Sequence, residues 1–125
     1  MTADSQQRWL DIDQLGGVTV VRLLCAELVQ EPEVDIVGKR LLRVVEELGA
    51  RRVVVNLAEV ARMDSGMIGK IIALYKTARK VGGRVALCEL NPMLFEALKA
   101  LHITRLLAIF ATEQDAVQAL GNAPC

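Results

Sequence analysis

Val53-Val54-Val55-Asn56-Leu57 and Met63-Asp64-Ser65-Gly66-Met67-Ile68-Gly69 together predict a buried strand, a short connection and the start of a helix. The first segment is rich in β-branched residues and does not alternate, which is typical of a strand covered on both faces. Asp64 is a good N-cap, since its carboxylate can accept hydrogen bonds from first-turn amides. Ser65 then falls at or beside the first helical position, where the helix dipole favours negative charge.

The helix that begins at Ser65 has one broad apolar face. Its members recur at three- and four-residue spacing, which is the period of an amphipathic helix: Met67, Ile68, Ile71, Ile72, Leu74 and Tyr75. Lys76, Arg79 and Lys80 suit the closing turns, where positive charge is favoured. Gly82-Gly83 is expected to end the helix.

Upstream, the sequence predicts a β-hairpin and then a helix. The hairpin strands are residues 8–13 and 18–25, joined by a turn at Gly16-Gly17. Residues 26–30 lead into a helix that starts near Pro32 or Glu33. Its expected buried face has helical spacing: Val34, Val37, Leu41, Val44, Val45 and Leu48.

Downstream, two further strand–helix pairs are predicted. A strand at residues 84–88 precedes Asn91-Pro92, an N-cap followed by a proline at the first helical position. The buried face of this helix is expected to comprise Leu94, Phe95, Leu98 and Leu101. A last strand at residues 106–110 leads to a helix capped by Thr112, with Val117 and Leu120 facing inward.

The order of elements predicts an α/β fold. Read along the chain it is ββαβαβαβα, and the interleaved helices favour a mixed, mostly parallel β-sheet after an N-terminal hairpin. We expect one domain at residues 8–121, a flexible tail at residues 1–7 and a short tail at residues 122–125. A chain of 125 residues is long enough to bury a core without disulfides or metals.

Composition limits the possible functions. Apolar residues make up 53% of the chain but aromatic residues only 3%, so the core must be aliphatic. Acids and bases balance at 15 each, and this absence of a basic surplus argues against direct binding of nucleic acid. No apolar run approaches the roughly 18 residues that a membrane span needs. The three cysteines, Cys25, Cys88 and Cys125, are far apart, and buried free thiols at the first two suit a cytoplasmic protein.

Neither a catalytic nor a metal site is expected. The single histidine, His102, follows a helix and has no evident nucleophile as a partner. Gly66-Met67-Ile68-Gly69-Lys70 has two residues between its glycines, whereas a phosphate-binding loop needs four. The acidic residues of the first third lack metal-ligand spacing: Asp11, Asp13, Glu27, Glu31 and Glu33. We therefore expect no cofactor and no enzymatic activity.

Two interpretations of Asp64-Ser65 remain open at this point. Both residues can be simple helix-capping residues. Alternatively, Ser65 is a site of phosphorylation. A phosphate there would bring about −1.5 to −2 charge to a helix start, next to Asp64. A partner protein resting on that surface would respond directly to the new charge.

The sequence resembles a STAS domain, with bacterial anti-sigma-factor antagonists as the nearest kin. The resemblance spans residues 9–120 and rests on residues 53–57, Met63-Asp64-Ser65 opening a helix, Gly82-Gly83 before a strand with Cys88, and Asn91-Pro92. At two places this sequence departs from the family pattern. Gly66-Met67 stands where a serine or threonine and then glycine is usual, and Ala26-Glu27-Leu28-Val29 stands where Gly-Glu-Leu-Asp is usual.

The resemblance implies a regulatory function. In the family, the serine after the aspartate is phosphorylated by a serine kinase that is also the anti-sigma factor, and a phosphatase reverses the reaction. Ser65 occupies the matching position, and the expected partner-binding residues are Asp64, Ser65, Gly66, Met67, Glu27 and Leu28. The alternative is an accessory or scaffold STAS subunit, without phosphorylation, in a stress-signalling or lipid-transport complex.

Overall fold

The centre of the molecule is a five-stranded sheet, seen in a computed structural model that describes residues 9–122. Its spatial order is β1-β2-β4-β6-β7. β1 is antiparallel to β2 and the other neighbours are parallel, which confirms the mixed, mostly parallel sheet. The strands are β1 (Leu10–Leu15), β2 (Val18–Leu23), β4 (Arg52–Asn56), β6 (Arg84–Cys88) and β7 (Ala108–Phe110).

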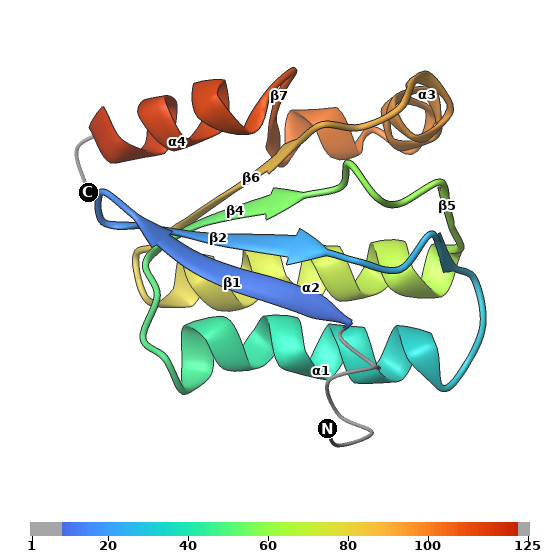
Figure 1. The fold of residues 1–125 in the computed structure, drawn as a ribbon, viewed down its shortest axis with the longest axis horizontal. Coiled ribbons are helices and arrows are strands. Elements are labelled where there is room, and N and C mark those ends of the chain that lie inside the picture. The colour runs from blue at the N-terminus through green and yellow to red at the C-terminus, as the bar shows by residue number, and fades with distance from the viewer. Residues whose placement is uncertain (1–8, 123–125) are drawn as a thin grey trace, which may run out of the picture.

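Helices cover both faces of this sheet. α1 (Glu33–Glu46) and α2 (Ser65–Lys80) lie side by side on one face, and α4 (Glu113–Asn122) lies on the other (Figure 1). α3 (Pro92–Ala100) follows β6, and its buried Leu94 and Leu98 join the core on the α1–α2 side. The molecule is thus a layered α/β domain, as the alternation of strands and helices predicts.

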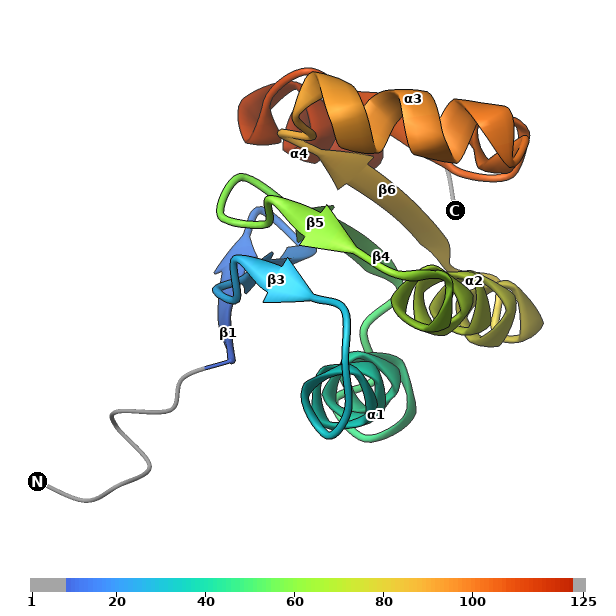
Figure 2. The same ribbon diagram turned by 90° about the vertical axis from the view of Figure 1, so that its right-hand side faces the viewer.

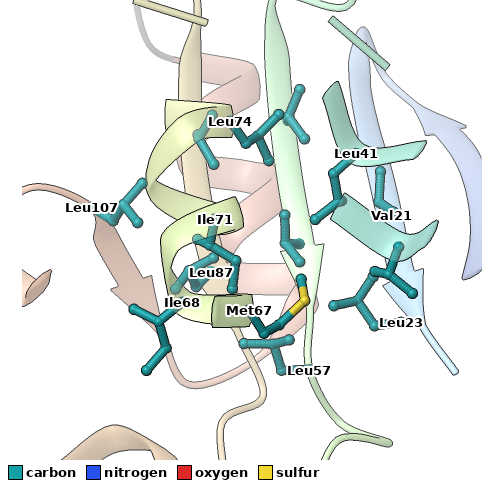
Figure 3. Close-up of a cluster of buried hydrophobic side chains, with 14 of the residues drawn as sticks. Val21, Leu23, Leu41, Leu57, Met67, Ile68, Ile71, Leu74, Leu87 and Leu107 are labelled. Carbon is teal, nitrogen blue, oxygen red and sulfur yellow. The ribbon is translucent and has the colours of Figure 1, made fainter. Parts of the chain in front are cut away.

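β4 explains why residues 53–55 do not alternate in the sequence. Val53 and Val55 point into the larger core cluster with α1 and α2, whereas Val54 points into the smaller cluster with α4. All three side chains have no exposed surface. Figure 3 shows the larger cluster, in which Met67 of α2 lies beside Leu57 at the end of β4.

The predicted hairpin and helix starts are confirmed. Gly16 and Gly17 both have positive φ, of 59° and 83°, as a two-residue turn between twisted strands requires. At α3, the Asn91 side chain accepts a hydrogen bond from the Leu94 amide at 2.8 Å. At α4, the Thr112 hydroxyl accepts one from the Asp115 amide at 3.1 Å. Each cap satisfies a donor that the helix itself leaves unpaired.

The structure adds three short elements that the sequence analysis missed. Two-residue strands β3 (Glu27–Leu28) and β5 (Arg62–Met63) pair with each other in parallel. A 3₁₀-helix, Ile103–Arg105, occupies the chain before the last strand, which starts at Ala108 rather than at residue 106. Strands of two residues are too short to show any periodicity, so hydrophobic pattern cannot find them.

Three residues that were predicted to lie in the core are exposed, and one thiol that was predicted to be buried is only partly so. Leu48, Phe95 and Leu101 are 61%, 38% and 55% exposed, and Cys25 is only partly buried. Leu48 and Leu101 lie just after the ends of α1 and α3, so they are not part of the helical faces that pack on the core. The short α3 buries only a narrow stripe, so Phe95 remains at its margin.

The expected tails fall outside the described residues, apart from Asn122, which the structure includes in α4. Cys125 also lies outside them. Within residues 9–122, none of the helices has the length and apolar character needed to cross a bilayer.

Candidate functional site

Ser65 lies exposed at the first position of α2. The preceding residue, Asp64, is extended, with φ −95° and ψ 179°, and its Oδ1 accepts a hydrogen bond from the Met67 amide at 2.9 Å. This geometry confirms Asp64 as the N-cap. The amides of Ser65 and Gly66 have no partner within the described part of the chain, so they can receive an anion.

β3 and β5 hold the segment before Ser65 in place. The Asp64 amide donates to the Leu28 carbonyl at 3.0 Å, and the Ala61 amide donates to the Ala26 carbonyl at 2.7 Å. The side chains of Glu27 and Arg62 form an ion pair of 3.0 Å, and both are more than half exposed. Figure 2 shows the two strands side by side. This ladder brings Glu27 and Leu28 next to Asp64 and Ser65, although 35 or more residues separate them in sequence.

The predicted partner-binding residues divide into exposed and buried ones. Ser65, Gly66 and Glu27 are exposed, and Asp64 is partly exposed. Leu28 and Met67 have no exposed surface, because both are part of the larger core cluster. These two support the surface from below and do not present their side chains to a partner.

There is little space for a side chain at position 66. A Cβ there would lie 3.2 Å from Oδ1 of Asp64 and 3.7 Å from Cγ1 of Val34 in α1. A larger residue would therefore crowd the carboxylate that caps α2.

α3 fixes the neighbouring loop. The Asn91 side-chain amide donates to the Ala61 carbonyl at 3.1 Å, while its oxygen caps α3. The Ala58 amide donates to the Asn56 side-chain oxygen at 2.8 Å. These bonds tie the ends of β4 and β6 to the loop that leads to α2, at the carboxyl end of the parallel strands.

A polar network next to this surface was missed in the sequence analysis. The Arg22 guanidinium donates to both carboxylate oxygens of Glu113, at 2.9 and 2.8 Å, and the Asn56 side-chain amide donates to the same carboxylate at 2.7 Å. The Glu113 amide donates to Glu89, a residue with φ of 61°. The sequence did contain a signal, because Arg22, Asn56 and Glu89 each stand at or just after the end of a strand.

The polar network and burial shift the pKa values of Glu113 and Cys88. The hydrogen bond from Arg22 lowers the pKa of Glu113, with a further contribution from Asn56. Burial raises the pKa of the Cys88 thiol to about 12, and the charges of Glu89 and Glu113 act in the same direction. Cys88 is therefore protonated and unreactive at neutral pH.

No catalytic arrangement emerges around His102, which is exposed and adopts φ of 61° after α3. In the described range 9–122, no three His, Cys, Asp or Glu residues are placed to hold a metal ion. The carboxyl-end surface offers an exposed hydroxyl, that of Ser65, beside a hydrogen-bonded cap and strand ladder.

Comparison with known proteins gives a consistent result. The STAS domain family model matches residues 10–116. An anti-sigma F factor antagonist of Paenibacillus polymyxa is 26% identical over 111 residues, covering 89% of this chain and 93% of that protein.

Solved structures agree on the fold. The anti-sigma-factor antagonist (STAS) domain protein of Planctomyces limnophilus superposes with a TM-score of 0.79 at 24% identity, over 89% of this chain and 96% of that one. The Bacillus cell fate determinant SpoIIAA, in its phosphorylated form, has a TM-score of 0.68 at 18% identity, over 88% of this chain and 97% of that one. At these identities the structural likeness concerns the fold alone.

Proposed function

The chain belongs to the STAS domain family, and we propose that it is a cytoplasmic, non-enzymatic regulatory protein of the anti-sigma-factor antagonist type. In this proposal it binds an anti-sigma factor that is also a serine kinase, and phosphorylation of Ser65 switches that binding off. A phosphatase restores the unmodified serine. The relative from Paenibacillus polymyxa, named an anti-sigma F factor antagonist, supports this assignment.

The observation that carries the proposal is the position of Ser65. Its side chain is exposed at a helix start whose surroundings are fixed by the Asp64 cap and by the β3–β5 ladder. A hydroxyl in this position is accessible to a kinase without local unfolding. The exposed Glu27 and Gly66 and the partly exposed Asp64 provide the rest of the proposed contact surface.

Phosphorylation at Ser65 would change binding more than folding. The free amides of the first turn and the helix dipole can accommodate a phosphate of about −1.5 to −2 charge. The Asp64 carboxylate next to it is already negative, and Glu27 lies in the adjacent strand. A partner surface shaped for a hydroxyl would have to desolvate the dianion beside these carboxylates, and this cost weakens the complex.

The test is a titration of the wild type, Ser65→Ala and Ser65→Asp against the serine kinase of the same genome. We expect Ser65→Ala to bind like the wild type but to stay bound when ATP is added. Ser65→Asp should bind at least tenfold more weakly, a loss of about 1.4 kcal/mol. Thr112→Asp is the matched control, since it adds one negative charge at the start of α4 and can retain the cap.

Circular dichroism of each variant establishes that it is folded, and mass spectrometry locates the phosphate. Equal affinity of all four proteins, or phosphate only at residues other than Ser65, would contradict the switch. That outcome would support the alternative, an accessory STAS subunit of a larger complex without a phosphorylation switch. The Gly66-Met67 departure from the family pattern is the feature that favours this alternative.

A further inference from the structure

The chain has no net charge, and both ends of the sheet carry acids and bases: Arg22 and Arg62 pair with acids at one end, and Glu46 and Glu47 lie at the end of α1 on the other. Helices α1, α2 and α4 begin at the carboxyl end of the parallel strands, where many acids gather: Glu27, Asp35, Asp64, Glu89 and Glu113. At the opposite end, β4 and β6 begin and α2 finishes (Figure 1). Basic residues gather there: Arg51, Arg52, Arg79, Lys80 and Arg84.

A cavity of about 310 Å³ opens at this basic end. It lies between the last turns of α2, the starts of β6 and β7, and the end of α4. The cavity is large enough for a small ligand. None of the residues that line it is acidic: Tyr75, Arg79, Gly83, Arg84, Val85, Leu106, Ala108 and Leu120.

Tyr75 holds one cation at the cavity. An Arg79 Nη1 donates to the Tyr75 hydroxyl oxygen at 2.8 Å, and the guanidinium carbon lies 5.7 Å from the centre of the tyrosine ring. The remaining guanidinium donors and the hydroxyl hydrogen of Tyr75 stay available for a ligand. This arrangement preorganises two neighbouring donors, which lowers the entropic cost of binding.

Arg84 supplies a second cation, on the first residue of β6. Its backbone amide donates to the Arg51 carbonyl at 2.7 Å, so the strand start is fixed. Its exposed side chain forms no ion pair among residues 9–122. The apolar part of the wall includes Leu106, which is 46% exposed and therefore leaves apolar surface uncovered.

We propose that this cavity binds a small organic anion, a carboxylate or phosphate monoester with a short apolar chain. Arg79, Arg84 and the Tyr75 hydroxyl bind the anionic group, and Leu106 and Ala108 contact the apolar chain. Guanidinium groups suit both head groups, because their planar donors match carboxylate and phosphate oxygens. The site lies at the opposite end of the sheet from Ser65, so it is independent of the proposed phosphorylation switch.

The test is an NMR titration of the isotope-labelled chain with hexanoate, butyl phosphate, inorganic phosphate and hexanol. We expect hexanoate or butyl phosphate to shift the amides of residues 83–85 and 106–108, and the stronger of the two identifies the head group. Arg84→Gln and Arg79→Gln should each weaken that binding at least tenfold. Arg40→Gln, which makes the same charge change on the exposed face of α1, should bind like the wild type.

A further variant, Leu106→Asp, leaves both arginines intact and places a carboxylate at the apolar wall. It should also weaken binding at least tenfold, so the proposal does not depend on the folding of the arginine variants. Three results would overturn it: no shifts with either amphipathic anion, equal affinity in all variants, or hexanol binding as tightly as hexanoate.

Discussion

Asp64 makes two structural contacts, one through its side chain and one through its backbone. Its carboxylate accepts the Met67 amide and its backbone amide closes the ladder to Leu28, so it ties α2 to β3. Asp64→Ala should lower the free energy of unfolding by about 0.5–2 kcal/mol, because the cap is lost. Asp64→Asn, which keeps an accepting oxygen, should lose less. Denaturant titration measures both, and an unchanged midpoint in Asp64→Ala would show that the cap contributes nothing.

Ile71 and Ile72 are neighbours whose burial differs. Ile71 is 1% exposed in the larger core cluster, whereas Ile72 is only partly buried at its margin. Ile71→Ala should cost about 2–5 kcal/mol of stability, since it leaves a cavity among packed side chains. Ile72→Ala should cost clearly less. The free energies come from urea denaturation, and a loss below about 1 kcal/mol for Ile71→Ala would refute this orientation of α2.

At the scale of elements, Gly38 lets α1 and α2 approach each other. A Cβ at position 38 would lie 2.7 Å from Cγ and 2.6 Å from Cδ of Lys70, whose amine reaches Asp35 at 3.6 Å. Gly38→Ala should therefore destabilise the protein by about 1–3 kcal/mol, because the lysine chain must move.

The double variant Gly38→Ala with Lys70→Ala isolates this contact. In the Lys70→Ala background only the β-carbon of residue 70 remains close, at 3.1 Å, so the alanine at position 38 should cost clearly less than beside the lysine. Its better helix propensity offsets part of the remaining cost. The ion pair to Asp35 is partly exposed and contributes little. Equal effects of Gly38→Ala with and without Lys70 in the thermodynamic cycle would rule out the steric explanation.

Some of these elements could be predicted from the sequence and others could not. Asp64, Asn91 and Thr112 were identifiable because a cap depends on local hydrogen bonds, and β4 because its residues are uniformly apolar. β3 and β5 were not identifiable from the sequence, since two-residue strands form only when other elements bring them together. Exposure of Phe95 depends on how the short α3 meets its neighbours, which helical periodicity does not determine.

For the molecule as a whole, the same distinction applies to the two proposed sites. The helix start at Asp64-Ser65, where we propose one site, was predictable because its residues are adjacent in sequence. The Arg22–Glu113 pair joins residues 91 positions apart, and the basic cavity combines α2, β6, β7 and α4. Such assemblies exist only in the folded chain, so their residues carry no local pattern.

The Arg22–Glu113 pair should make stability depend on pH. Because its folded-state pKa is lowered, Glu113 stabilises the fold above its ordinary pKa of 4.5, and this contribution disappears as the pH falls through the lowered pKa. Glu113→Gln should lower the free energy of unfolding at neutral pH by about 1–3 kcal/mol, since a bidentate charged contact is lost. The difference from the wild type should shrink as the pH falls from 4.5 through the lowered pKa, because Glu113 becomes neutral in the folded protein, like glutamine, only below that lowered pKa.

Asp115→Asn is the appropriate control for this experiment. Asp115 is also an acid in the first turn of α4, but it is exposed and its amide, not its carboxylate, makes the capping contact. The control should therefore show little difference from the wild type at either pH. Urea titrations across the acid range measure all three proteins. A Glu113→Gln deficit that stayed constant with pH would mean that packing of α4, rather than the charge pair, accounts for the stabilisation.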